Sequence, residues 1–317
     1  MVTRKHPVVA VTGASGAGTT VVQRAFREIF QKRGLNAAFV EGDSFHRYEP
    51  DEMCSVVADA AQEDRFLSCY GPELNDFSAL EHLFRRYSET GTGRVRHRVT
   101  SENQHQYPEV NEAFTPWEDI PENTDLLFYE GLHGGVVASS WTRRKMSEST
   151  NPVVVERRRQ GVNGGVDVAQ YVDLLIGVVP AINLEWIQRI HHDRQCFDQT
   201  PEQVTHDIIA RLRDYIHFIV PQFSLTDINF QRMPVVDTSN PFIADMVPTE
   251  TESVMVVRFR EPKKYDFPLF LRRIDGAFMS RANTMVIPGG EFRHALSVIC
   301  SPLIERCCVN LDSGYDD

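Results

Sequence analysis

The feature that most constrains this chain is a glycine-rich segment, GASGAGTT at residues 13–20, that lies between two regular elements. The β-branched run at 6–12 predicts a buried strand, and residues 20–34 carry apolar side chains near the helical period and end at a glycine. Strand, loop and helix in this order, with the spacing G-x4-G-x-T, are typical of a phosphate-binding loop. Small residues let backbone N–H groups converge on phosphate oxygens, and the helix N-terminus adds positive potential. The expected phosphate-binding residues are Gly13, Ala14, Ser15, Gly16, Ala17, Gly18, Thr19 and Thr20.

The loop departs from the usual pattern at one position. Thr19 stands where a lysine normally neutralises charge on the β- and γ-phosphates, while the Thr20 hydroxyl has the position of a magnesium ligand. A phosphate site of this kind needs a cation from elsewhere, and Arg189 and Arg194 on a later predicted helix are the candidates. The alternative is a glycine turn after a strand that binds no ligand.

Short apolar runs alternate with longer amphipathic stretches along the rest of the chain. Near-continuous apolar runs are typical of strands that are covered on both faces, and their alternation with helices indicates βαβ units. We therefore expect an α/β fold with a largely parallel sheet. The further predicted strands lie at 37–40, 125–129, 171–179, 233–236 and 253–259, and the further helices at 78–90, 183–197, 201–220 and 292–309.

The length of 317 residues is compatible with one large domain, which we expect over residues 1–310. Residues 139–169 are rich in serine, glycine and asparagine and carry two basic clusters, so they are interpreted as an inserted surface segment. The acidic residues 311–317 are expected to form a flexible tail.

Charge and cysteine content exclude several classes of protein. The chain has 33 basic and 44 acidic residues, a net charge of −11, whereas non-specific nucleic-acid binders usually carry the opposite sign. No apolar run approaches the ~20 residues that span a bilayer, and residues 1–10 do not resemble a signal peptide. The six cysteines form no CxxC pair and no zinc-ligand spacing, which is typical of free thiols in a reducing compartment. We expect a cytoplasmic protein that binds neither nucleic acid nor membrane.

Two carboxylates follow predicted strands directly. Asp43 lies in EGDSFHR and Glu130 in LLFYEG. Parallel sheets bind ligands beyond the carboxyl ends of their strands, and a kinase needs one carboxylate to accept a proton from the attacking hydroxyl and others to hold magnesium. Both are therefore candidate catalytic residues. The alternatives are a helix N-cap for Asp43 and a hydrogen-bonding strand end for Glu130.

A third group of polar residues lies on the predicted helix at 183–197. Arg189, His192 and Asp193 share one helix face, because they are spaced i, i+3 and i+4. An arginine and an aspartate at this spacing are equally typical of a solvated ion pair, so the pattern by itself identifies no site.

Several longer motifs resemble the bacterial-type phosphoribulokinase family. They are VEGDSFHR, LLFYEGLHGG, IGVVPAINLEWIQRIHHDR, IVPQFSLTDINFQR, PVVDTSNPF, VVRFR and FMSRANTMVIPG. The similarity covers nearly the whole chain except the segment around 139–169 and the tail, and bacterial members also lack the lysine of the loop. The resemblance implies a P-loop kinase-like fold whose mixed, mainly parallel sheet is flanked by helices on both faces. It further implies transfer of the γ-phosphoryl group of MgATP to the C1 hydroxyl of D-ribulose 5-phosphate, which gives the ribulose 1,5-bisphosphate used by Rubisco in the Calvin cycle.

The resemblance also implies roles for residues at matching positions. Asp43 resembles the general base, Asp193 a catalytic acid associated with magnesium, and Arg189 stands where the family has a catalytic lysine. Glu130 resembles a Walker-B acid and joins Asp193 and Thr20 as the expected magnesium ligands. The residues expected to contact the sugar phosphate are His46, Arg47, His133 and Arg194.

Four positions depart from the family, which has arginines where this chain has Pro50, His192, Phe197 and Ala210. The first three of these arginines serve substrate binding or catalysis in the family, and the last serves regulation. A lost charge-assisted hydrogen bond to phosphate costs roughly 1.5–3 kcal/mol, or about tenfold to a hundredfold in affinity. Arg47 and the basic clusters of 139–169 are candidate substitutes. Two alternatives therefore stay open: a related uridine or sugar-phosphate kinase, and a nucleotide-binding regulatory paralogue with weak or no turnover.

The resemblance extends to regulation. Bacterial members are activated by NADH at a site built from arginines, and Lys32, Arg258 and Arg281 occupy matching positions, which implies an allosteric site for NADH. Plant-type members use a disulfide that involves a cysteine of the phosphate loop; Ala17 stands there, so no thiol switch is expected. We also expect a homo-oligomer.

Overall fold

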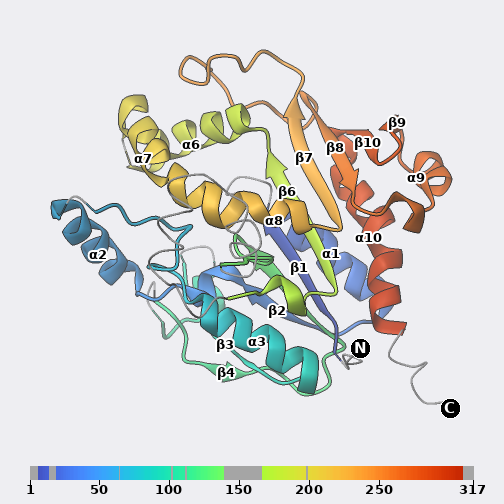
Figure 1. The fold of residues 1–317 in the computed structure, drawn as a ribbon, viewed down its shortest axis with the longest axis horizontal. Helices are drawn as coiled ribbons and strands as arrows, with labels where there is room; N and C mark the ends of the chain where they lie inside the picture. The colour runs from blue at the N-terminus through green and yellow to red at the C-terminus, as the bar shows by residue number, and fades with distance from the viewer. Residues whose placement is uncertain are drawn as a thin grey trace, which may run out of the picture.

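The computed structural model describes residues 6–13, 19–63, 65–100, 103–110, 113–138, 166–197 and 199–309, and at 19, 20, 51, 196, 197 and 309 it describes the backbone only. Over these ranges one sheet is built from β1 (Val8–Gly13), β2 (Ala37–Glu41), β5 (Leu126–Gly131), β6 (Leu174–Pro180), β7 (Ile228–Pro234), β8 (Ser253–Phe259), β9 (Phe278–Arg281) and β10 (Thr284–Pro288). The strand order is β2-β5-β1-β6-β7-β8-β10-β9 (Figure 1). The first five strands in this order are parallel, and the last three continue the sheet antiparallel. The expected α/β fold with a mixed, mainly parallel sheet is confirmed.

Helices and short turns connect the strands. The α-helices in the described ranges are α1 (Thr19–Arg33), α2 (Pro50–Gln62), α3 (Phe77–Thr90), α6 (Ile182–Phe197), α7 (Pro201–Asp214), α8 (Val220–Leu225), α9 (Phe267–Arg273) and α10 (Phe292–Val309). A separate small sheet pairs β3 (Arg94–Val95) with β4 (Glu118–Asp119). The shorter helical turns are η1 (Gly42–Phe45), η2 (Gln104–Gln106), η3 (Ala169–Tyr171), the π-helical η4 (Tyr215–Ile219), η5 (Pro262–Lys264) and η6 (Gly289–Glu291).

Strand β1 lies in the middle of the sheet and is covered on both faces. Val9 and Val11 belong to the core cluster that contains α1 and α10, whereas Val8 and Ala10 belong to the cluster that contains α3. None of these four residues is more than 3% exposed. In Figure 1, α1 and α10 lie on one side of the sheet and α3 on the other. Burial on both faces is the reason why the strand is an uninterrupted apolar run.

The strand predicted at 233–236 is wrong in its position. The observed strand β7 runs from Ile228 to Pro234; buried and half-buried residues alternate in its first half, and the rest is half-buried. Ile228 and Phe230 enter the core beside α10, whereas the polar residues between them face the opposite side. Because only one face is fully buried, the sequence alternates here and shows no continuous apolar run.

The segment predicted as one helix at 201–220 is helical throughout, but it divides into three elements. Helix α7 begins after a capping box in which Thr200 and Gln203 exchange side-chain to backbone hydrogen bonds, and it ends at Asp214. The π-helical turn η4 follows directly, and α8 then begins at Val220 and contains Pro221. Proline has no N–H for the carbonyl four residues earlier, so the regular pattern of helix hydrogen bonds is interrupted here.

The segment predicted as a surface insertion at 139–169 is described only at its end, because 139–165 lie outside the described residues. Val166 and Val168 are joined to the core: Ala138 N–H donates to the Val166 carbonyl at 2.8 Å, and Val168 N–H donates to the Val136 carbonyl at 2.9 Å. Val168 is completely buried, so residues 166–168 belong to the fold and not to a surface segment. The predicted tail at 311–317 lies outside the described residues.

The parallel strands place their carboxyl ends along one edge of the sheet. In the β2–β5 pair, Glu41 is opposite Glu130, and in the β1–β5 pair, Thr12 is opposite Gly131. The turn that carries Asp43 and the start of the phosphate loop therefore begin on two strands that flank β5. Within the described ranges, no helix is both long and apolar enough to cross a membrane.

Candidate active site

Asp43 lies in the tight turn η1, directly after β2. Gly42 permits this turn, because a Cβ atom there would lie 2.7 Å from Tyr129 Oη and 3.0 Å from Gly131 Cα. Phe45 is buried and anchors the far side of the turn. The Asp43 side chain remains 52% exposed, so it is held at the sheet edge and is accessible to a ligand.

Two side chains contact the Asp43 carboxylate. Arg98 Nη1 donates to Oδ2 at 3.1 Å, and His46 Nε2 lies 3.7 Å from Oδ1. Burial lowers the pKa of His46 below its ordinary value, although the charge of Asp43 opposes this effect. His46 is therefore neutral at pH 7, and Arg98 supplies the positive charge beside Asp43.

Arg96 stabilises the turn that carries Asp43. Its Nε donates to the Ser44 carbonyl at 2.9 Å, and its Nη2 donates to the His46 carbonyl at 2.6 Å. The guanidinium lies 3.8 Å from the centroid of the Phe114 ring and 5.0 Å from that of Trp117. These contacts join two segments that lie far apart in the chain and define the backbone path around Asp43.

Sequence reasoning missed Arg96 and Arg98, because residues 90–121 are polar, contain scattered turn residues and show no periodic pattern. The signal that the sequence does offer is RVRHR at 94–98, which places three arginines within five residues.

Glu130 lies at the end of β5, on the strand next to β2. Burial raises the pKa of this carboxyl group to about 7, the hydrogen bond that Gln23 Nε2 donates at 2.9 Å opposes the rise, and the charges of Glu41 and Asp43 add to it. A divalent cation beside Glu130 would favour the ionised form. The Glu130 carboxyl group is therefore suited to bind a cation.

The residues near Glu130 fit a magnesium ion that arrives together with phosphates. Mg²⁺ prefers oxygen ligands and is usually bound by one or two carboxylates plus waters and phosphate oxygens. No group of three or more His, Cys, Asp or Glu side chains in the described ranges forms a metal cage of its own. A half-buried carboxylate at the end of a strand next to β1 is suited to such an ion.

A cavity of about 620 Å³ connects these features. It contains Gly13, the first residue of the predicted phosphate loop, together with Asp43 and Glu130. Residues 14–18 lie outside the described residues, and Thr19 and Thr20 are described only as the first backbone positions of α1. The other residues that line the cavity are Gln23, Arg27, Phe39, Glu41, Gly42, His97, Arg98, Thr100, Asn103, Gln106, Tyr107, Gly131 and Leu132.

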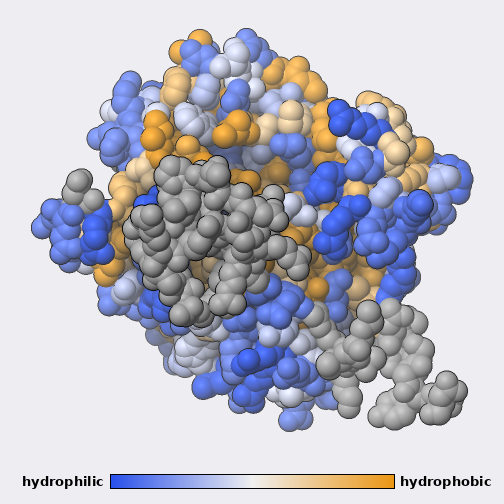
Figure 2. All heavy atoms as spheres, in the orientation of Figure 1, coloured by the Kyte–Doolittle hydropathy of each residue, from blue (hydrophilic) through white to orange (hydrophobic). Residues whose placement is uncertain are grey.

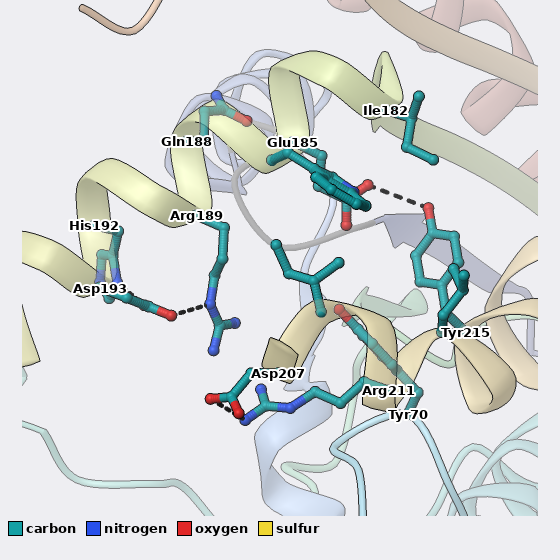
Figure 3. A pocket seen from close by; sticks show the side chains of 13 residues that line it. Tyr70, Ile182, Glu185, Gln188, Arg189, His192, Asp193, Asp207, Arg211 and Tyr215 are labelled. Carbon is teal, nitrogen blue, oxygen red and sulfur yellow. Dashed lines mark hydrogen bonds and ion pairs between the residues drawn. The ribbon is translucent and has the colours of Figure 1, made fainter. Parts of the chain in front are cut away.

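Asp193 and Arg189 line a different cavity, of about 390 Å³, between α6 and α7 (Figure 3). Asp193 is 1% exposed; Arg189 donates to its Oδ2, and His192 Nδ1 donates to its Oδ1 at 2.8 Å. The predicted pair is therefore a buried ion pair and not a solvated one. Each carboxylate oxygen of Asp193 therefore accepts one hydrogen bond from its own helix.

The loop at Cys69 and Tyr70 is within electrostatic reach of both groups of residues. Burial raises the pKa of the Cys69 thiol; the charges of Arg211 and Arg189 oppose this rise, and the charge of Asp43 adds to it. Tyr70 lines the second cavity, and its carbonyl accepts a hydrogen bond from the buried His133. Asp43 and Arg189 thus act on the same thiol.

The residues predicted to contact the sugar phosphate are not gathered at one place. Arg47 Nε donates to the Pro72 carbonyl at 2.9 Å, and its Nη1 lies 3.6 Å from Asp76 Oδ2. His133 is buried against Phe77, with 4.7 Å between ring centroids, and burial lowers its pKa to about 3. Arg194 is exposed on α6. Only His46 of this set touches Asp43.

The four positions that depart from the family pattern lie in helices. Pro50 is the first residue of α2, where proline is well tolerated. His192 bonds Asp193, and Ala210 is half-buried in α7. Phe197 ends α6, and its side chain lies outside the described residues. None of these positions carries an arginine or a lysine.

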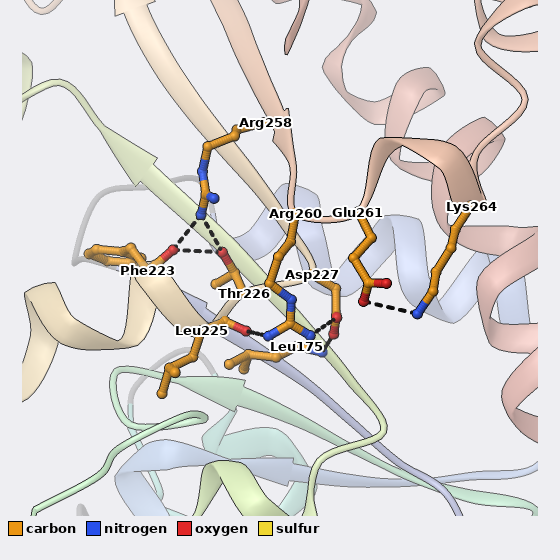
Figure 4. A network of polar contacts seen from close by, with 9 residues as sticks. All are labelled: Leu175, Phe223, Leu225, Thr226, Asp227, Arg258, Arg260, Glu261 and Lys264. Carbon is orange, nitrogen blue, oxygen red and sulfur yellow. Dashed lines mark hydrogen bonds and ion pairs between the residues drawn. The ribbon is translucent and has the colours of Figure 1, made fainter. Parts of the chain in front are cut away.

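The residues predicted for an allosteric site lie on three separate elements. Arg258, in β8, donates to the Phe223 carbonyl at 2.6 Å and to Thr226 Oγ1 at 3.3 Å, next to the contacts of Arg260 with Asp227 (Figure 4). Lys32 is exposed in the last turn of α1, and Arg281 is exposed at the end of β9. The Arg258 guanidinium thus joins α8 to β8 within the chain.

Comparison with known proteins agrees with this architecture. The model of the phosphoribulokinase / uridine kinase family matches residues 8–239. A protein described as phosphoribulokinase from Nitrobacter vulgaris is 46% identical over 303 residues, which cover 95% of this chain and 96% of that protein. The chromosomal phosphoribulokinase of Cupriavidus necator is 46% identical over 304 residues and 95% of this chain. The solved structure of phosphoribulokinase from Rhodobacter spheroides superimposes with a TM-score of 0.81 at 43% identity, over 97% of this chain and 99% of that chain. The chain therefore belongs to the phosphoribulokinase / uridine kinase family.

Proposed function

We propose that this protein is a phosphoribulokinase, an ATP-dependent kinase that phosphorylates the C1 hydroxyl of D-ribulose 5-phosphate. Relatives described as phosphoribulokinases match it over almost their whole length. The observation that carries the proposal is the single cavity that contains the start of the phosphate loop, Glu130 and the exposed carboxylate of Asp43. A kinase requires these three features at one place, because the phosphate donor, its cation and the base must meet the same hydroxyl.

Asp43 acts as the base in this proposal. The C1 oxygen attacks the γ-phosphorus and forms a new P–O bond, while the bond from the γ-phosphorus to the β–γ bridging oxygen breaks and its electron pair leaves with ADP. The hydroxyl proton passes to the Asp43 carboxylate, which is half exposed and lines the cavity. The buried Arg96 contacts hold the turn so that this carboxylate faces the ligand.

Glu130 and Thr20 would hold the magnesium ion that accompanies ATP, and when bound this ion would neutralise part of the phosphate charge. Gln23 orients the Glu130 carboxyl group by its hydrogen bond. Arg27 lines the same cavity with its guanidinium over the Phe39 ring, 4.0 Å from the centroid, and is a further cation near the phosphates. The magnesium ion and Arg27 would together supply the positive charge that a lysine at the position of Thr19 would provide.

Arg189 and Asp193 line the second cavity and are also proposed to take part in catalysis. Arg189 would contact the γ-phosphoryl group, and Asp193 would orient Arg189 through their ion pair. Asp193 also remains the proposed second carboxylate near magnesium.

We also propose that the protein is regulated by NADH, that it assembles into a homo-oligomer and that it is located in the cytoplasm. Exposed apolar side chains support the oligomer. They lie on the connection between β7 and β8 and include Phe242, Ile243 and Met246, which are 46%, 73% and 77% exposed. This connection is at the top of Figure 1, and in the same orientation Figure 2 shows hydrophobic residues among hydrophilic ones at the top of the molecule. An apolar patch of this kind favours a protein contact.

The experiment that tests the proposal measures ADP release by the full-length protein with MgATP and a panel of acceptors. We expect release to depend on ribulose 5-phosphate. Release that depends on uridine or on another sugar phosphate would replace the proposed acceptor by that compound. Tight ATP binding without transfer to any acceptor would contradict the proposal and favour a regulatory paralogue.

A further inference from the structure

A second guanidinium beside Asp43 has no assigned role. Arg98 follows β3 in the chain, and its Nη1 lies 3.1 Å from Asp43 Oδ2. The Arg98 side chain is 33% exposed and lines the cavity that also contains Gly13 and Glu130. It is therefore a cation that touches the proposed base from within the ligand cavity.

The backbone around Arg98 is firmly held. Asn103 Nδ2 donates to the Arg98 carbonyl at 2.8 Å, and Thr100 N–H donates to Asn103 Oδ1 at 2.7 Å. Val99 is buried, and its N–H donates to the Ala113 carbonyl at 2.8 Å. The base of the side chain is thus fixed at the cavity wall, while its long stem can still turn the guanidinium within the cavity.

The guanidinium has binding capacity beyond its ion pair. Arginine carries five N–H donors, and the hydrogen bond to Asp43 uses one of them. The same cavity is lined by the polar side chains of His97, Thr100 and Gln106. A planar guanidinium beside polar side chains is suited to a phosphate, which arginine binds through two parallel hydrogen bonds.

The acids of the cavity favour a cation at this position. Three acids, Glu41, Asp43 and Glu130, line it, and an acceptor with its own phosphate would add further negative charge. Arg27 also lines the cavity, with its guanidinium over the Phe39 ring of β2. Arg98 is the second arginine among the described lining residues, and it lies beside Asp43.

The other arginines near Asp43 form hydrogen bonds and ion pairs with other groups. Arg96 donates to two backbone carbonyls and stacks on Phe114, and Arg47 bonds the Pro72 carbonyl and faces Asp76. Pro50 stands where the family has an arginine, so that position supplies no charge. Of the arginines in the described part of this region, Arg98 is the one that contacts Asp43 within the cavity.

We propose that Arg98 is the specificity-determining residue that binds the phosphate group of the acceptor and selects phosphorylated over unphosphorylated sugars. The inference rests on the proposed function. In the absence of acceptor, Arg98 occupies Asp43 Oδ2; the acceptor phosphate draws the guanidinium away, and the carboxylate then becomes available to the C1 hydroxyl at the other end of the same molecule. Binding of the phosphate and release of the base are thereby coupled.

The test uses full-length Arg98→Met and Arg98→Lys, with Arg94→Met as the matched control. Arg94 lies on the surface, where it pairs with Asp119 at 3.6 Å and donates to the Trp117 carbonyl, and it does not line the cavity. We expect Arg98→Met to raise KM for ribulose 5-phosphate about tenfold to a hundredfold, with KM for ATP changed less than about twofold. Arg98→Lys should recover only part of the affinity, because lysine keeps the positive charge but lacks the planar guanidinium that forms two parallel hydrogen bonds. The preference in kcat/KM for ribulose 5-phosphate over D-ribulose should fall in Arg98→Met, and Arg94→Met should behave as wild type.

Calorimetric titration of ribulose 5-phosphate and ribose 5-phosphate into the same variants separates this inference from the proposed function. A wild type that binds either sugar phosphate but transfers no phosphoryl group would contradict the proposed function. Weaker binding of the same compounds by Arg98→Met would still support the proposed role of Arg98 in binding the phosphate. If wild type and Arg98→Met bind these compounds equally, or if wild type binds neither, the role of Arg98 is overturned. Thermal unfolding of each variant confirms that it is folded before its affinity is compared.

Discussion

Gln222 accepts a hydrogen bond from the hydroxyl group of Thr12, with 2.8 Å between Oε1 and Oγ1. The same oxygen accepts from Gly135 N–H at 2.9 Å, and the side-chain Nε2 donates to the carbonyls of Leu132 at 2.9 Å and Phe218 at 2.7 Å. Gln222 is 1% exposed. One buried amide thus joins α8 to the residue before the phosphate loop and to the turn after β5.

Replacement of Gln222 by leucine should destabilise this junction. The change leaves hydrogen-bonding groups of β1, of the turn after β5 and of η4 without this partner, and we expect the free energy of unfolding to fall by about 2–4 kcal/mol in urea titrations. Gln188→Leu is the matched control, because Oε1 of Gln188 is buried and meets no hydrogen-bond donor among the described residues. A loss in Gln222→Leu no larger than that in Gln188→Leu would contradict this reading of the junction.

Asp43→Asn should separate proton transfer from binding. Asparagine keeps the shape of the side chain and an acceptor for Arg98, but it is not a base at neutral pH. We expect kcat to fall by about 10²–10⁴ while KM for ATP stays within about twofold, measured by ADP release. Asp119→Asn, at the exposed end of the β3–β4 sheet, should leave kcat unchanged. A variant at Asp43 that retains more than about a tenth of kcat would exclude this residue as the base.

Gly42→Ala should displace the Asp43 turn. The new Cβ would lie 2.7 Å from Tyr129 Oη, a fully buried group, and 3.0 Å from the Gly131 backbone, so the turn must move. We expect about 1–3 kcal/mol of lost stability together with a reduced kcat. Gly290→Ala is the control, since nothing lies within 4 Å of a Cβ there. Equal behaviour of the two variants would show that the close approach at Gly42 is unimportant.

Glu185 should make folding stability depend on pH. Burial raises the pKa of its carboxyl group to about 7, and the hydrogen bond from Tyr215 Oη at 3.2 Å opposes the rise. Since the folded state holds this proton more tightly than the unfolded state, its contribution to stability is full below the ordinary pKa and is lost as pH rises to about 7.

Glu185→Gln keeps an acceptor for Tyr215 and removes the titration. We expect its stability to equal that of wild type near pH 4 and to exceed it by about 1–3 kcal/mol at pH 8, in urea titrations at both pH values. Glu89→Gln, at an exposed position of α3, should show no such difference. A constant offset between Glu185→Gln and wild type at the two pH values would contradict the raised pKa.

The sequence predicted those parts of the fold and of the candidate site that local patterns determine. Strand β1 is buried on both faces and is a continuous apolar run, so its position could be predicted; β7 is fully buried on one face only, and its start at Ile228 was missed. Asp43 and Glu130 were predicted because each directly follows a strand, and the pairing of β2 with β5 brings them to neighbouring positions.

The remaining site residues depend on contacts between distant segments. Arg96 reaches the Ser44 carbonyl across 52 positions of sequence, and Arg98 reaches Asp43 across 55. No local periodicity encodes such contacts, because they depend on how an irregular segment crosses the sheet edge. For the same reason, the sequence alone did not show that Arg47 turns toward Asp76 and away from the ligand cavity.

The most direct test of the central claim follows the phosphorus atom itself. Phosphorus NMR of the full-length protein with MgATP and ribulose 5-phosphate should show loss of the γ-phosphate signal of ATP and the appearance of ADP together with a second monoester signal on the sugar, at equal rates. Loss of ATP with release of inorganic phosphate, and no new signal on the sugar, would contradict the account.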